Sequence, residues 1–280
     1  MNMFLSVTSI AAPLLLITTG ALVSEYAGRL AMFLECIINM GAFFCYAFSI
    51  LTGNALAGTV ISLALCCAIV FILERTASRF KANMFLVSLS MNLLFSAFTT
   101  FFSVLAFKSR GVLFSEEFLF SPGTMRLVTS IACYAVSAIL ILTLSFTKTG
   151  LIMRITGSDP EVLESRGYSA DTFRCLSWII AAFCGSLCGS VLTLRLSSYV
   201  PGMSGGRGWT ALAAVFLGKK SPLLVALAVI VFALAEYASS YIQNIEIFRN
   251  IPSSILLALP YLISLLLIII IPQKKEMPVK

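Results

Sequence analysis

Two glutamates, Glu35 and Glu236, lie inside long apolar stretches of the sequence. A carboxylate in the middle of a membrane-spanning helix costs about 2.5–3.5 kcal/mol on insertion scales, so we expect Glu35 to face a cavity or a polar partner. Two roles fit this position: a place on a transport pathway, or a structural contact such as an ion pair with Arg29. Glu236 lies closer to the end of its apolar stretch, and we expect water to solvate it.

Asn92 is a further polar side chain within an apolar stretch. One interpretation is a hydrogen bond to a neighbouring helix, a contact worth roughly 0.6–1.7 kcal/mol in membranes. The other is a place on the same pathway as Glu35.

The sequence lacks the residue sets that enzymes use. It contains eight Cys and no His, and the cysteines lie in or beside apolar runs without a CxxC pair, which is typical of small buried hydrophobic residues. Without histidine, zinc sites and proton shuttles lose their usual residue. Since there is also no Walker lysine motif and no histidine-based triad, we predict no catalytic residue, metal or cofactor, and ATP hydrolysis must come from another chain.

The composition indicates the environment of these residues. Of the 280 residues, 59% are hydrophobic and 11% are charged, whereas soluble domains average roughly 45–50% and about 25%. Several apolar runs approach the ~20 residues that cross a ~30 Å hydrocarbon layer. We predict an all-α polytopic membrane protein, one transmembrane domain over residues 1–280 with about eight to nine transmembrane helices plus a half helix. The predicted spans are 4–23, 30–51, 55–73, 84–107, 127–146, 176–196, 222–240 and 252–271.

Basic residues assign the sides of the membrane. The formal net charge is +7, which the positive-inside rule explains better than nucleic-acid binding does. Basic residues gather at 75–81, 148–174, 219–220 and 274–280, and all four groups lie inside only if the short apolar segment 209–218 returns as a half helix. Because successive spans cross the membrane in alternating directions, the same assignment places the N-terminus outside. Irregular backbone at membrane depth is tolerated only where protein buries it or where it lines a cavity.

A glycine-rich stretch precedes this half helix. Because glycine adopts backbone conformations closed to other residues, we expect an abrupt turn there. The half helix would then begin with unpaired N–H groups at a cavity, as in transporters with broken helices. We therefore predict a central substrate pathway bordered by Glu35, Asn92, Gly205, Gly206, Gly208 and Trp209. The alternative is that the glycines only permit tight packing.

The segment 148–174 is the one long inside loop, and its charge is mixed. Asp159 is a typical N-cap, Pro160 suits the first helical position, and Gly167 is a typical stop signal. We predict a short amphipathic helix over 157–167 that docks on a soluble partner; a solvated connector is the alternative. The residues of this predicted docking helix are Gly157, Asp159, Pro160, Glu161, Glu164, Arg166 and Gly167.

These two segments together resemble the permeases of ABC importers for simple sugars and nucleosides, the ribose and branched-chain amino acid permease superfamily. In that family a short helix docks on the ATP-binding subunit. Its pattern is matched by Gly157, Pro160, Gly167 and Tyr168, with Glu164 and Ser165 around the positions of the usual alanines. The family's glycine-rich block is matched by Gly206, Gly208, Trp209, Ala213, Gly218 and Pro222.

Two upstream stretches resemble the nucleoside-type permeases of this family. Asn92 is in register with the asparagine of the fourth span, while Met32 replaces an asparagine and Cys36 a glycine of the family pattern. The agreeing positions in the first stretch are Ser24, Glu25, Ala27, Gly28 and Glu35. The two replacements imply a divergent member with a different ligand.

The resemblance implies a fold like that of type II ABC importer permeases and a site in the cytoplasmic membrane of a bacterium. The implied cargo is a small ribosyl- or ribityl-type solute, with riboflavin or a nucleoside favoured and a simple sugar such as ribose as the alternative. The implied partners are ATP-binding cassette subunits, a second permease of the same or a sister chain, and an extracytoplasmic solute-binding protein or lipoprotein. An ion-coupled secondary transporter is the alternative class, although it needs an ion or proton relay.

Overall fold

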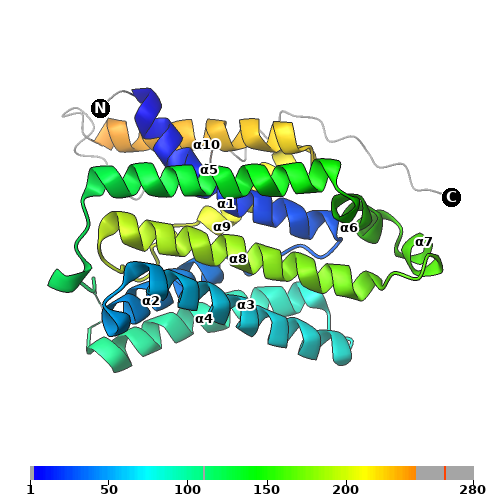
Figure 1. The fold of residues 1–280 in the computed structure, drawn as a ribbon, viewed down its shortest axis with the longest axis horizontal. Helices are drawn as coiled ribbons and strands as arrows, with labels where there is room; N and C mark the ends of the chain where they lie inside the picture. The colour runs from blue at the N-terminus through cyan, green and yellow to red at the C-terminus, as the bar shows by residue number, and fades with distance from the viewer. Residues whose placement is uncertain (1–2, 110, 244–261, 263–280) are drawn as a thin grey trace.

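The computed structural model describes residues 3–109, 111–243 and 262. Seven of the described helices are long and apolar enough to cross a membrane, and they run roughly along the long axis of the molecule (Figure 1). They are α1 (Met3–Tyr26), α2 (Leu34–Thr52), α3 (Ala55–Arg79), α4 (Met84–Phe107), α5 (Pro122–Phe146), α8 (Ala170–Leu196) and α10 (Pro222–Gln243). The shorter helices are η1 (Glu116–Phe118), α6 (Lys148–Ser158), α7 (Pro160–Ser165) and α9 (Arg207–Leu217).

Polar caps determine where several of these helices begin. The side chains of Asn54, Asn83 and Asp159 accept hydrogen bonds from backbone N–H groups in the first turns of α3, α4 and α7. These groups have no partner inside the helix, so a side-chain acceptor stabilises the helix start. The same short polar residues therefore interrupt the apolar runs and start the next helix.

The predicted spans are helical where the structure describes them, with one correction. The span predicted at 84–107 has these bounds, and the predicted half helix corresponds to α9. The prediction of a helix from residue 30 was wrong, because residues 27–33 are not helical and α2 begins only at Leu34. Backbone groups in this linker find other partners: the Trp178 indole donates to the Arg29 carbonyl at 2.8 Å. The predicted span 252–271 lies outside the described residues.

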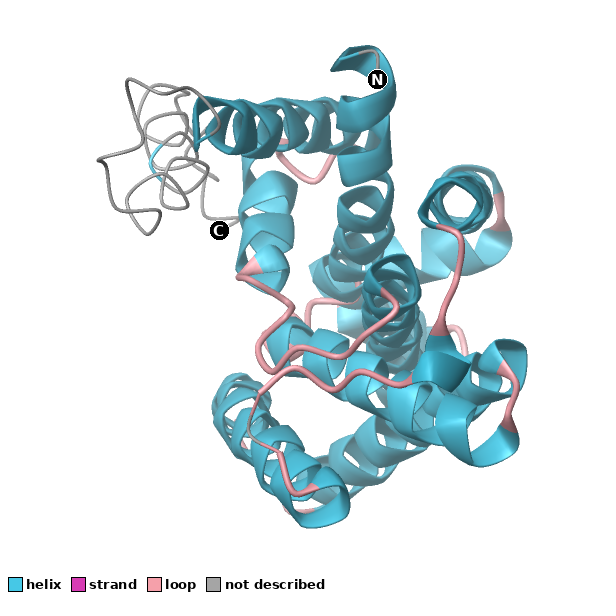
Figure 2. Cartoon of the chain, turned by 90° about the vertical axis from the view of Figure 1, so that its left-hand side faces the viewer, coloured by secondary structure: helices cyan, strands magenta, loops and turns pink. Residues whose placement is uncertain are grey.

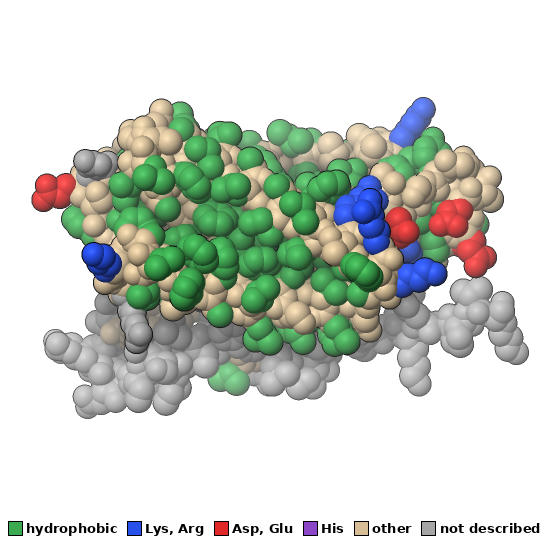
Figure 3. Space-filling model, turned by 90° about the horizontal axis from the view of Figure 1, so that it is seen from below, with side chains coloured by type: hydrophobic (Ala, Val, Ile, Leu, Met, Phe, Trp, Pro, Cys, Tyr) green, Lys and Arg blue, Asp and Glu red, His purple; other side chains and the backbone are tan. Residues whose placement is uncertain are grey.

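The protein core lies where α1, α2 and α8 pack against one another. In their membrane-length windows 72%, 67% and 67% of residues are buried, against 22–28% in α3, α4 and α5. Apolar side chains cover the flank seen in Figure 3, and the charged side chains on it gather toward its two ends. All eight cysteines are free, Cys67 is half-buried and the other seven are buried, as predicted. The fold thus has a protein-buried centre and an apolar periphery suited to lipid.

The helices α6 and α7 lie together at one end of the molecule, and α1 begins at the opposite end (Figure 1). Figure 2 views this opposite end, where loops join the long helices. This arrangement agrees with the predicted topology, in which the N-terminus and the segment 148–174 lie on different sides of the membrane.

Candidate functional site

The carboxylate of Glu35 joins the beginnings of two helices. Glu35 lies in the first turn of α2. Its Oε1 accepts hydrogen bonds from Ser204 Oγ at 2.5 Å and from the Gly206 N–H at 2.7 Å, and its Oε2 accepts from the Gly208 N–H at 2.8 Å. Gly206 is the N-cap of α9. Because unpaired N–H groups and the helix dipole favour a negative charge at a helix N-terminus, Glu35 caps α9 although it belongs to α2.

Asn39 and Ser204 complete this junction. The Asn39 side chain donates to Ser204 Oγ at 2.8 Å, and the Ser204 N–H donates to Asn39 Oδ1 at 3.1 Å. Sequence reasoning missed both residues. The available signals were the spacing of four between Glu35 and Asn39, which places both on one helix face, and the position of Ser204 directly before the glycines.

Asn92 caps α2 from the neighbouring helix α4. Its Oδ1 accepts a hydrogen bond from the Cys36 N–H at 2.8 Å. Cys36 lies in the first turn of α2, and the α2 N-cap, Phe33, makes no side-chain capping bond. Asn92 therefore replaces the missing cap, which is the interhelical contact considered for it above.

Different constraints act on the glycines of the turn. Gly205 and Gly206 have φ angles of +53° and +80°, a region that other residues rarely adopt, and the predicted abrupt turn is confirmed there. A Cβ on Gly208 would lie 2.5 Å from Glu35 N, so this glycine permits close packing. The expectation of unpaired N–H groups at the start of α9 was wrong for Gly206 and Gly208, because Glu35 accepts a hydrogen bond from each.

The neighbours of the turn also differ from expectation. Arg207, the first residue of α9, forms an ion pair with Glu236 on α10. The Glu236 side chain, which we expected water to solvate, is 30% exposed and also has this charged partner, which was not predicted. Trp209 is 41% exposed and has no hydrogen bond to the Glu35 carboxylate.

The proposed ion pair between Arg29 and Glu35 was wrong. Arg29 instead binds Glu74 on α3 at 2.6 Å and Asp171 on α8 at 2.7 Å. Glu74 is 1% exposed, and a buried carboxylate requires such a partner. The pairing fixes the linker 27–33 to α3 and α8, near the end of the molecule that carries α6 and α7.

A short helix is present where the docking helix was predicted, with a shorter range. Asp159 Oδ1 accepts a hydrogen bond from the Val162 N–H, Pro160 is the first residue of α7, and Gly167 follows with a φ of +81°. The prediction of one helix from Gly157 was wrong, because Gly157 belongs to α6 and Pro160 begins a separate helix. Only one side chain of α7 is buried. The charged residues of the segment, Asp159, Glu161, Glu164 and Arg166, are exposed and form no ion pair among the described residues.

Gly157 holds α6 against the linker between α1 and α2. A Cβ on Gly157 would lie 2.2 Å from the Tyr26 carbonyl oxygen and 2.9 Å from the Gly28 N–H nitrogen. The Arg154 guanidinium lies over the Tyr26 ring, 4.9 Å from its centroid, and the Tyr26 hydroxyl donates to the Lys220 carbonyl. The segment before α7 is thus in direct backbone contact with the linker that leads to Glu35.

Seven membrane-length helices surround the short helix α9, whose start is held inside the protein by Glu35. A short helix of this kind among membrane-spanning helices is typical of transporters, and the chain is a multi-pass membrane protein of this type. A family model described as "Branched-chain amino acid transport system / permease component" matches residues 3–272. The chain belongs to this family.

Several known permeases are similar to the chain. It is 26% identical over 278 residues to the guanosine ABC transporter permease protein NupQ of Bacillus subtilis, covering 91% of this chain and 87% of that protein. It is 28% identical over 256 residues to the putative glucose ABC transporter permease protein TsgC13 of Haloferax volcanii, covering 85% and 76%. It is 22% identical over 294 residues to the nucleoside ABC transporter permease protein NupC of Lactococcus lactis, covering 95% and 90%.

Two solved structures share the fold. One is titled "PsaBC from Streptococcus pneumoniae in complex with Fab" (TM-score 0.56, 14% identity, covering 98% of this chain and 94% of that chain). The other is a putative metal-chelate type ABC transporter in an inward-facing conformation (TM-score 0.57, 18% identity, 95% and 84%). The predicted ABC importer permease fold is confirmed. As predicted, the chain is a transport component and not an enzyme, and ATP hydrolysis belongs to a partner subunit.

Proposed function

We propose that this chain forms half of the transmembrane pathway of an ABC importer for a nucleoside or a simple sugar, in the cytoplasmic membrane of a bacterium. The observation that carries the proposal is the backbone contact between α6 and the linker 27–33 that leads to α2. This contact connects the exposed helix α7, which follows α6, with the Glu35 carboxylate and the start of α9. In this proposal the partners are ATP-binding cassette subunits, a second permease of the same or a sister chain, and an extracytoplasmic solute-binding protein or lipoprotein.

A nucleoside is the cargo that we favour. Two relatives that match most of the chain are named as guanosine and nucleoside permeases, and a third as a putative glucose permease. Riboflavin, with its ribityl chain, was equally favoured by the sequence, but none of these three relatives is named for it. An exposed aromatic side chain beside the turn, Trp209, offers a surface on which a nucleobase would stack.

The pathway in this proposal passes the turn 204–208 and the first residues of α9. Glu35 accepts three hydrogen bonds within the protein, so its role is to hold the turn in place while the solute contacts the turn and α9. Asn92 acts in the same way by fixing the start of α2. Movement of α7 on its ATPase would reach this turn through Gly157, Gly28 and the linker.

A transport assay on the whole complex tests the cargo. Proteoliposomes would hold the permease pair, the ATPase subunits and the solute-binding protein, and would be offered guanosine, adenosine, ribose, glucose and riboflavin. We expect ATP-dependent uptake of nucleosides, with KM for guanosine raised roughly tenfold in Trp209→Ala and little changed in Trp209→Phe, because base stacking is worth about 1–3 kcal/mol. Preferred uptake of riboflavin or a sugar would make that solute the cargo in place of a nucleoside. Uptake driven by an ion gradient without ATPase subunits would overturn the proposal of an ABC importer.

A charge reversal tests the docking helix. Glu164→Lys changes an exposed side chain of α7, so the chain should fold and insert normally. We expect solute-stimulated ATP hydrolysis to fall roughly tenfold, since reversing a charge within an interface disturbs the charge complementarity of the two partners. The matched control is Glu116→Lys, an exposed glutamate of η1, far from α7 along the chain. Equal activity of the two variants would remove α7 from the docking surface.

A further inference from the structure

Three arginines from three helices line one pocket at the end of the molecule where α1 begins. Arg126 on α5, Arg195 on α8 and Arg207 on α9 border a pocket of about 310 Å³ together with Ser6 and Ser9 of α1. The outer ends of α1, α5 and α8 meet here, far from the docking helix (Figure 1).

The positive charge in this pocket is only partly compensated. Arg207 pairs with Glu236, but among the described residues no carboxylate pairs with Arg126 or Arg195. The described acceptors of Arg195 are neutral: Thr129 Oγ1 at 2.8 Å, the Ser9 carbonyl at 2.7 Å and Ser130 Oγ at 2.9 Å. Within the described part of the chain, two guanidinium charges therefore face the pocket without a counter-ion, and such groups bind phosphate strongly.

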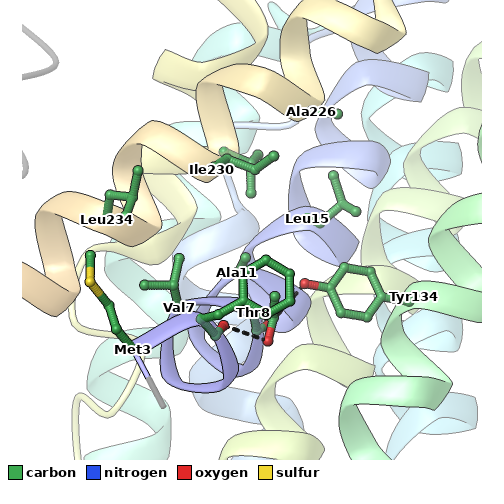
Figure 4. Close-up of a pocket in the computed structure, with 11 residues that line it drawn as sticks. Met3, Val7, Thr8, Ala11, Leu15, Tyr134, Ala226, Ile230 and Leu234 are labelled. Atoms are coloured by element: carbon green, nitrogen blue, oxygen red, sulfur yellow. Dashed lines mark hydrogen bonds between the residues drawn. The ribbon is translucent and has the colours of Figure 1, made fainter.

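The pocket continues into apolar grooves along α1. A second pocket of about 470 Å³ shares Ser9 and Arg126 with it and runs between α1 and α5 past Leu127 and Ile131. A third, of about 600 Å³, shares Thr8 and Tyr134 with the second. Its remaining walls are apolar residues of α1 and α10, Met3, Phe4, Val7, Ala11, Leu15, Ala226, Val229, Ile230 and Leu234 (Figure 4).

The two grooves meet at Tyr134 and Thr8, which line both of them. The Tyr134 hydroxyl donates a hydrogen bond to the Thr8 carbonyl at 2.8 Å (Figure 4). The three pockets thus form one surface with a cationic mouth and apolar walls. A free anion would make no contact with the apolar walls, and a neutral lipid would leave the positive charges of the arginines without a counter-charge.

We propose that this surface binds an anionic phospholipid, with its phosphate at Arg126 and Arg195 and an acyl chain in the groove between α1, α5 and α10. The argument is charge complementarity at the mouth together with continuity of the apolar walls. Because Arg207 begins α9, a phosphate in this pocket lies next to the turn that Glu35 holds. The inference is independent of which solute is carried.

Thermal unfolding of the purified whole transporter in detergent tests this proposal. Phosphatidylglycerol and phosphatidylcholine with the same acyl chains are compared with inorganic phosphate. We expect phosphatidylglycerol to raise the Tm in a saturable way, and the other two to leave it unchanged. Arg126→Gln, an exposed residue, should weaken the apparent affinity roughly fivefold, since one arginine near an anionic lipid is worth about 1 kcal/mol.

Two control pairs keep the outcomes distinct. Arg79→Gln is the control for Arg126→Gln, because it removes an exposed charge at the far end of α3. Ala226→Phe fills the groove without changing any charge, and its control is Leu227→Phe, which alters an exposed neighbouring residue outside the groove. Support requires that Arg126→Gln and Ala226→Phe weaken the effect and that Arg79→Gln and Leu227→Phe do not. An equal effect of phosphate alone would show a free-anion site, and an equal effect of phosphatidylcholine or of Arg79→Gln would show unspecific lipid binding; each result overturns the proposal.

Discussion

Glu35 shows how a carboxylate is kept inside an apolar helical bundle. It combines a position in the first turn of α2 with three hydrogen bonds from the turn 204–208. Two of the donors are backbone N–H groups at the start of α9, so the negative charge meets two helix N-termini. The residue therefore caps α9 from a position in the first turn of α2.

Glu35→Gln should destabilise the complex. The amide retains one acceptor oxygen but places an NH₂ group opposite backbone donors, and an unsatisfied buried donor costs about 1–3 kcal/mol. We expect a lower Tm of the purified complex, with Glu164→Gln on the exposed helix α7 as the control that leaves the Tm nearly unchanged. An unaltered Tm combined with lost transport would instead show direct contact between Glu35 and the solute.

At the scale of elements, the contact between α6 and the α1–α2 linker is the route by which we expect movement of α6 and α7 to reach α2. Gly157 and Gly28 approach each other so closely that a Cβ on either would lie 3.0 Å or less from an atom of the other. The linker is fixed on its other side by the Arg29 ion pairs with Glu74 and Asp171. A displacement of α6 therefore acts on a restrained segment that ends at α2.

Gly157→Ala should disturb this contact. The added Cβ would lie 2.2 Å from a backbone oxygen, which cannot rotate away as a side chain can, and such overpacking costs about 1–3 kcal/mol. We expect ATP hydrolysis to continue while transport per ATP falls, measured in proteoliposomes. Gly111→Ala is the control, because a Cβ there meets only Ser109 Oγ, at 3.9 Å, and Gly111 lines none of the pockets described above. Normal coupling in Gly157→Ala would show that this contact transmits no movement.

At the scale of the whole molecule, the exposed apolar side chains of α3, α4 and α5 require apolar neighbours. Some of this surface faces lipid, and in our proposal part of it faces a second permease. Native mass spectrometry of the transporter extracted with its ATPase subunits should show two permease chains, either two copies or this chain with a sister. A complex with a single permease chain and a single ATPase subunit would contradict the proposed pair.

The sequence by itself determined the membrane-length helices of the described residues, the half helix and the short helix that follows Asp159. Apolar length, basic loops and cap residues such as Asn83 and Asp159 are local signals, and helices respond to local signals because their hydrogen bonds join residues four positions apart. The sequence also singled out Glu35 and the glycine-rich turn as the unusual features of the chain.

Only the tertiary structure decided which groups these features meet. Glu35 contacts a turn about 170 positions away, Arg29 contacts Glu74 and Asp171 instead of Glu35, and Glu236 meets Arg207. Asn39 and Ser204 became part of the site only through the packing of α2 against the loop before α9. Polar side chains in an apolar interior pair with whichever partner the helix packing brings within hydrogen-bond distance. Since packing is set by the whole chain, no local pattern could select these partners.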